Sequence, residues 1–211
     1  METLTPDKRS ARIGKDDRKS QILEIALEMF LREGFAAVSM SSIAARVGGS
    51  KATLYNYFAS KEELFAATVA ARCEQLQSII YDVEAEGGSF CDSLQRLGER
   101  FLALIMTDDS IALFRLVIAE SARFPELGHG FFEAGPNRGQ ERVAEFLSHG
   151  IAQGALRAGD VLEMGRAFLD LLSSDIHRKR LCNVMPEPSP EMIARNAERA
   201  ARQFLAIYGT A

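Results

Sequence analysis

Apolar residues recur at helical spacing along most of the chain. Between residues 16 and 33, Ile22, Ala26, Met29 and Phe30 stand at i, i+4, i+7 and i+8, which places them on one face of a helix. A comparable period predicts further helices at 40–47, 51–58, 60–86, 89–106, 109–123, 126–134, 137–154, 160–184 and 189–208. No segment of useful length alternates with period two. The pattern therefore predicts an all-α fold.

A glycine pair separates the two shortest of the early helices, 40–47 and 51–58. Glycine tolerates the positive φ that a sharp helix exit requires, and a serine stands at the N-cap position before each helix. Two helices joined by such a turn form a helix-turn-helix, whose second helix enters the major groove of DNA. The spacing therefore predicts a DNA-binding head.

The second short helix carries two kinds of residue. Leu54 and Phe58, four apart, can anchor one face in the core. The other positions offer a cation, a hydroxyl, two phenols and an amide, without any acid: Lys51, Thr53, Tyr55, Asn56 and Tyr57. This composition suits a surface lined by phosphates. The alternative is a short core helix with half-buried tyrosines.

Residues 50–64, SKATLYNYFASKEEL, resemble the signature of the TetR family of bacterial transcriptional regulators. The preceding IAxxVG at 43–48 and EGF at 33–35 also match the N-terminal domain of that family, and the likeness extends over roughly residues 17–77. Gly49 departs from it, because the family usually has an apolar residue there. The resemblance implies a three-helix DNA-binding head on a helical body that binds ligands and dimerises.

The resemblance also implies which side chains contact DNA. Lys51, Ala52 and Tyr55 would meet base edges. The phosphate contacts would come from Ser39, Ser41, Thr53, Tyr57 and Lys61, and the predicted surface also includes Ser50 and Asn56. The expected partner is a palindromic operator in double-stranded DNA, with half-sites about one helical turn, or a multiple of it, apart.

The distribution of charge supports a small DNA-reading head on a larger body. The net charge is −4, yet residues 1–61 hold ten Lys/Arg against seven Asp/Glu, whereas residues 62–211 hold fifteen against twenty-two. We therefore expect a flexible basic arm at 1–15, a head at 16–77 that includes the start of a linker helix, and a ligand-binding and dimerisation domain at 78–211.

The body resembles the AcrR/AefR-like branch of the same family, through LVIAESARFPEL at 116–127 and FEAGP at 132–136. A regulator of this kind is expected to bind a small, largely apolar effector. The candidate contacts are adaptable apolar residues and a few polar neighbours, although any one of them is more often simply core: Phe101, Met106, Phe114, Glu120, Arg123, Phe124, His129, Phe131 and Phe168.

The last two predicted helices, 160–184 and 189–208, are candidates for a two-fold interface between copies of the chain. Their alanines would permit close helix approach. The residues expected at the homodimer interface are Phe168, Leu172, Ile176, Ala197, Ala201, Phe204 and Leu205. The alternative is that these faces complete the core of a single chain.

Other classes of protein find little support. The sequence has no glycine-rich phosphate loop, GxSxG or HExxH, so an enzyme is not expected. No apolar run is long enough for a membrane span, and three scattered cysteines favour neither a disulfide nor a metal site. No cofactor is expected, and the chain is predicted to act in the bacterial cytoplasm, at the nucleoid when bound to DNA.

The sequence thus predicts a homodimeric repressor that a small effector releases from its operator. Two rivals stay open. One is an activator or DNA-binding scaffold controlled by a protein partner. The other is a redox sensor that works through Cys73, Cys91 or Cys182.

Overall fold

The structure is a computed structural model that describes the backbone from residue 15 to residue 210, and the side chains of these residues except 15, 72–81, 84 and 85. The predicted basic arm therefore lies outside the described residues, apart from Lys15. The helices within this range are α1 Lys15–Glu33, α2 Met40–Val47, α3 Lys51–Tyr55, α4 Lys61–Glu86, α5 Phe90–Ile105, α6 Asp108–Glu120, α7 Pro125–Ala134, α8 Pro136–Ala152, α9 Val161–Ser173, α10 Ile176–Leu181 and α11 Pro190–Tyr208.

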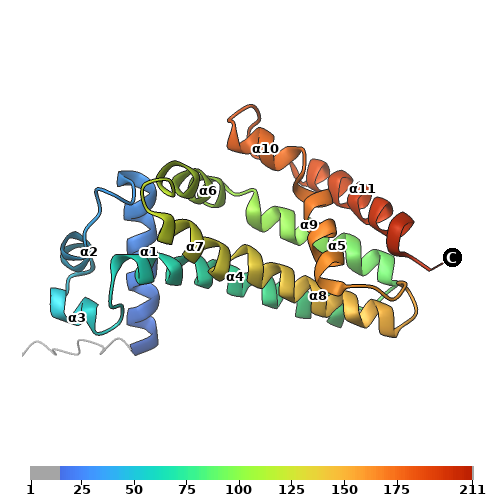
Figure 1. Cartoon of the computed structure of the whole chain (residues 1–211), viewed down its shortest axis with the longest axis horizontal. Coiled ribbons are helices and arrows are strands. Elements are labelled where there is room, and N and C mark those ends of the chain that lie inside the picture. Colours follow the sequence, from blue (N-terminus) through green and yellow to red (C-terminus); the bar gives the residue numbers. More distant parts are fainter. Residues whose placement is uncertain (1–14, 211) are drawn as a thin grey trace, which may run out of the picture.

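The elongated molecule has its first three helices at one end (Figure 1). Helix α4 starts in this head and runs beneath the body, and its 26 residues span about 39 Å at 1.5 Å per residue. Helices α7 and α8 lie along it, and α10 and α11 lie on the side of the body away from α4. In the part of the chain that the structure describes, β-pairing is limited to an isolated bridge between Leu156 and Gly209. The expected all-α fold is confirmed.

The core of the head extends into the body. Phe30, Phe35 and Phe65 meet with ring centroids 5.5 to 5.7 Å apart. The same hydrophobic cluster includes Val117 of α6 and Phe131 of α7. The boundary predicted between head and body therefore does not coincide with a gap in the packing, because α6 and α7 share the core of the head.

The second cluster fills the body around α5, α9 and α11. Phe168 and Phe204 form an edge-to-face pair with centroids 5.3 Å apart. Gly98 of α5 lies where these helices approach most closely, since a Cβ atom there would be 2.8 Å from Leu172 Cδ2 and 3.3 Å from Ala197 Cβ. The small residue thus allows α5 to pack directly on its two neighbours.

The prediction of one helix over 160–184 is wrong. Helix α9 ends at Ser173 and α10 begins at Ile176. The break falls at a Ser-Ser-Asp sequence whose side chains form local hydrogen bonds: Ser173 Oγ donates to the Leu169 carbonyl at 2.8 Å, and Asp175 accepts from Lys179 at 2.9 Å. The serine back-bond to the residue four positions earlier destabilises and bends a helix, whereas the Asp175–Lys179 pair supports the first turn of α10. The break turns α10 into a separate short element against α6.

Candidate DNA-binding surface

The first helix of the helix-turn-helix is capped as the sequence predicts. Ser39 Oγ accepts from the Ser42 amide at 3.0 Å, and Ser42 Oγ accepts from the Ser39 amide at 3.0 Å, so the two serines form a capping box. At the other end, Gly48 adopts φ +73°. The amides of Gly48 and Gly49 close the last turn on the carbonyls of Ala45 and Ala44.

An arginine of α1 holds this turn in place, and the sequence analysis did not single it out. Arg18 Nη2 donates to the Val47 carbonyl at 3.1 Å, and its other terminal nitrogen donates to Gln21 at 2.7 Å. A Cβ atom at Gly49 would lie 3.2 Å from Arg18 Nη2. The departure from the family pattern at Gly49 therefore leaves room for this guanidinium. Its pairing with a carbonyl 29 residues away is not visible in local sequence.

Helix α3 presents one face to the core and the other to solvent. Leu54 and Phe58 are 2% and 3% exposed, which confirms their anchoring role. Tyr55 is 44% exposed, and the Lys51 ammonium lies 5.7 Å from the centre of its ring. The predicted contacts that are exposed are Ser39, Ser41, Ser50, Lys51, Ala52, Thr53, Tyr55 and Asn56. The alternative of a buried core helix therefore does not hold for this face.

Two of the predicted polar contacts have local structural partners. Ser50 caps α3, with its hydroxyl accepting from the Thr53 amide at 3.0 Å and lying 2.8 Å from Thr53 Oγ1. Tyr57 is half-buried against the head core, with its ring centroid 6.5 Å from that of Phe58. Helix α3 ends at Tyr55 rather than at Phe58. Tyr57 therefore lies in the turn that follows the helix.

Lys61 has partners within the head. Its ammonium donates to the carbonyls of Phe35 at 2.7 Å and Val38 at 2.9 Å, and it lies 4.2 Å from the centre of the Phe35 ring. Two of its three N–H donors are therefore bound to the α1–α2 connection. Lys61 therefore positions this connection on α4, and its contact with a phosphate stays a prediction.

Two residues predicted to touch an effector instead contact the head. Glu120, at the end of α6, accepts from the Ala36 amide at 3.4 Å. The Phe124 ring lies 5.3 Å from that of Phe35, and 5.9 Å from the Lys61 ammonium. Together these residues form a joint between α6 and the helix-turn-helix. The joint assembles segments about 85 residues apart, which is why sequence spacing did not reveal it.

The other predicted effector contacts do not form one site. Phe101, Met106 and Phe168 belong to the body cluster. Phe114 and Phe131 belong to the head cluster, with their centroids 4.9 Å apart. Arg123 and His129 are exposed. The nine predicted side chains are therefore divided between two clusters and the surface.

The predicted dimer contacts require a correction as well. Phe168, Leu172, Ala197 and Phe204 are fully covered within a single chain, Ala201 is 2% exposed and Ile176 is 6% exposed, while Leu205 is half-buried. These faces of α9 and α11 complete the core of the chain itself against α5, the alternative that the sequence left open. A contact with a second copy would have to use surfaces other than these covered faces.

The described residues show little else that points to chemistry. They contain no group of three or more His, Cys, Asp or Glu placed to hold a metal ion. Among them, no helix is long and apolar enough to cross a membrane. Cys91 and Cys182 are exposed free thiols, whereas the side chain of Cys73 lies outside the described set.

Comparison with known proteins agrees with this geometry. Residues 22–68 match the family described as bacterial regulatory proteins of the tetR family, and residues 92–210 match the AefR-like transcriptional repressor C-terminal domain. The HTH-type transcriptional regulator YfiR of Bacillus subtilis is 30% identical over 142 residues, which are 66% of this chain and 68% of that protein. The chain spans a smaller share, 33% and 42%, of two other curated relatives.

Solved structures show the same architecture over the whole chain. A TetR-family regulator from Mesorhizobium loti is 28% identical and superposes with a TM-score of 0.79, covering 97% of this chain and all of that one. The flavonoid-responsive regulator FrrA is 31% identical with a TM-score of 0.74, covering 92% of this chain and 98% of that one. The chain is therefore a DNA-binding transcriptional regulator rather than an enzyme, and it belongs to the TetR family, with an AefR-like C-terminal domain.

Proposed function

We propose that this protein is a homodimeric repressor that a small, largely apolar effector releases from a palindromic operator. The observation that carries the proposal is the exposed, acid-free face of α3, mounted on a head whose core continues into α6 and α7. The exposed face of α3 would contact DNA. The shared core would connect the body mechanically to this helix.

The reading helix would place Lys51, Ala52 and Tyr55 against base edges in the major groove. An ammonium and a phenol can both hydrogen-bond to base edges, and Ala52 can approach a thymine methyl group. Ser39, Ser41 and Thr53 lie exposed beside them for phosphate contacts. Because the head carries only a modest positive charge, two heads on two half-sites would supply the affinity that one head lacks.

A homodimer would join the outward faces of α9 and α11. Asn196, near the start of α11, donates to the Leu172 carbonyl near the end of α9, so the two helices run in opposite directions. Leu162 and Ile207 therefore fall at the same end of the pair, where they are 45% and 55% exposed. Light scattering of Leu162→Glu and Ile207→Glu should show loss of the dimer. Val184→Glu, on a residue 73% exposed in the α10–α11 loop, is the matched control.

The effector would act through the joint between α6 and the head. A shift of α6 moves Glu120 and Phe124, and these contact the connection that Lys61 holds on α4. An effector releases DNA only if it binds the released arrangement more tightly than the DNA-bound one. FrrA, a similar structure over almost its whole length, is named as flavonoid-responsive, which supports control of this architecture by a small molecule.

Fluorescence anisotropy tests the proposal with the duplex upstream of the gene and a scrambled duplex, over a salt series. The wild-type protein should prefer the upstream duplex, and Tyr55→Ala should reduce this preference. A reporter fused to the upstream region should rise when the gene is deleted. A fall in reporter expression would show that the protein is an activator and not a repressor. Equal binding of both duplexes by the wild type would show that the upstream duplex does not contain the proposed operator.

A further inference from the structure

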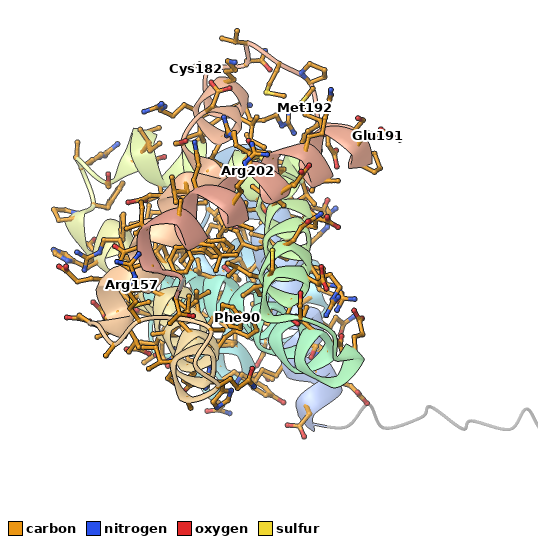
Figure 2. The ribbon with its side chains drawn as sticks, turned by 90° about the vertical axis from the view of Figure 1, so that its right-hand side faces the viewer. Phe90, Arg157, Cys182, Glu191, Met192 and Arg202 are labelled. Atoms are coloured by element: carbon orange, nitrogen blue, oxygen red, sulfur yellow. The ribbon has the colours of Figure 1, made fainter. Side chains whose placement is uncertain are left out.

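A cationic groove lies between α10 and α11, on the side of the body away from α4. Its volume is about 470 Å³, within the range of small-molecule sites. Figure 2 looks onto this end of the body and shows Met192 near the start of α11 and Cys182 just after α10. Ile176, Met185 and Met192 supply apolar lining, whereas Lys179, Arg195 and Arg199 supply cations.

The cations of the groove are only partly neutralised. Lys179 forms a salt bridge with Asp175, 2.9 Å away on the same helix. Arg199 donates through Nη2 to Asn196, while its Nε is buried without a hydrogen-bond partner. Arg195 forms no salt bridge with any residue in the described part of the chain. Neither guanidinium forms a salt bridge within the described part of the chain, although the carboxylates of Glu191 and Asp175 lie within electrostatic range of Arg195 and Arg199, respectively. Both guanidinium groups line the groove, and the unpaired Arg199 Nε is costly because it is buried.

The lining selects the chemistry of an occupant. A guanidinium offers paired N–H donors that match a carboxylate. Methionine side chains adapt to apolar groups of varied shape. A second copy of the chain fits less well, because a two-fold contact brings the same surface against itself and would oppose like charges. A bare inorganic anion would leave the apolar lining in contact with water.

We propose that this groove binds an amphipathic monocarboxylate as the effector, with the carboxylate on Arg195 and Arg199 and the apolar tail along Met185, Met192 and Ile176. The binding part of this inference stands alone, whereas the effector part rests on the proposed function.

The opposite face of α10 connects the groove to the joint at the head. Arg180 is 5% exposed and donates to the Met106 carbonyl at 3.2 Å and to Asp108, at the start of α6, at 2.6 Å. Arg115 of α6 donates to the carbonyls of Arg180 and Leu181, and His177 meets the ring of Phe114, also on α6. A ligand that separates α10 from α11 would therefore displace α6, which ends at Glu120 and leads into the turn before Phe124, the N-cap of α7.

Titration calorimetry of the full chain with octanoate tests the site, with octanamide as the uncharged probe of the same length. We expect octanoate to bind and octanamide to bind at least about tenfold more weakly, the effect of losing one charge-assisted hydrogen-bonded pair. Arg195→Gln and Arg199→Gln should each weaken octanoate by about tenfold. Arg202→Gln is the matched control, because Arg202 lies further along α11, outside the groove, beside Glu198 (Figure 2).

Three outcomes would overturn the site: no binding of octanoate at millimolar concentration, equal binding of octanamide, or equal binding by all three variants. A change of molecular mass in Arg195→Gln, with octanoate affinity unchanged, would make the groove an interface between copies. Anisotropy then tests the effector role: octanoate should release DNA from the wild type but not from Arg195→Gln. Failure of the wild type to bind DNA would remove the proposed function, while calorimetry would still decide whether the groove binds carboxylates.

Discussion

Replacing Lys61 by methionine should destabilise the head without removing a phosphate contact. The substitution keeps the aliphatic stem and deletes the two hydrogen bonds to the Phe35 and Val38 carbonyls, at 2.7 and 2.9 Å. A hydrogen bond from a charged donor contributes about 1.5–3 kcal/mol, and the lower value applies at this partly exposed site, so the loss is about 3 kcal/mol. At about 2–4 °C per kcal/mol for a chain of this size, thermal unfolding should shift down by about 6–12 °C.

Circular dichroism at 222 nm measures the shift, and anisotropy over a salt series measures the DNA contact. Lys51→Met is the matched control, because Lys51 is exposed on α3. It should leave thermal unfolding unchanged and weaken binding to the upstream duplex by about 1–3 kcal/mol relative to a scrambled one, the effect of losing one base contact. The reasoning would be refuted if Lys61→Met unfolded like the wild type and reduced the salt slope by about 0.9 per head, the effect of losing one phosphate contact.

Three further changes test other parts of the structure. Tyr55→Ala should weaken binding to the operator by about 1–3 kcal/mol relative to binding to a scrambled duplex, which is the usual contribution of a base contact. Thermal unfolding should stay unchanged. Competition anisotropy measures the two affinities, and an equal loss for both duplexes would contradict the prediction. Arg180→Met should lower the free energy of unfolding in urea by only about 1–2 kcal/mol, because the Met106 carbonyl loses a donor while the Asp108 carboxylate, 84% exposed, stays hydrated. Burial lowers the pKa of His177 below its ordinary value of 6.5, so the unfolded chain binds the proton more readily. Stability should therefore fall as the pH drops below about 6.5, and His177→Gln should flatten this part of a urea–pH profile; an unchanged profile would contradict it.

The joint at Glu120 and Phe124 connects the body to the DNA-binding head. The head does not have a closed core of its own, because its aromatic cluster is completed by α6 and α7. A displacement of α6 must therefore change the packing around Phe35, next to the start of the helix-turn-helix. Close-packed cores transmit such displacements, since they contain few voids that could absorb them.

Local sequence was sufficient for the helices and for the reading surface. Hydrophobic period, serine caps and glycine stops are properties of neighbouring residues, so α2 was predicted with its bounds and the ends of most other helices within three residues. The exposure of Lys51 and Tyr55 followed in the same way, because the anchors Leu54 and Phe58 fix which side of α3 is buried. The break between α9 and α10 was missed, since its Ser-Ser-Asp sequence is compatible with a continuous helix.

Only the tertiary structure decided what the long-range neighbours of each side chain are. The apolar faces of α9 and α11 could have met a second copy, yet α5 covers them, with Gly98 permitting the close approach. Lys61 has the charge of a phosphate ligand, but two carbonyls 23 and 26 residues away bind its ammonium. The sequence by itself determined most of the helices, the family and the exposed face of α3, because periodicity and capping act over a few residues. Which charges remain free, and which apolar faces are already covered, depends on contacts between distant segments, and those exist only in the folded chain.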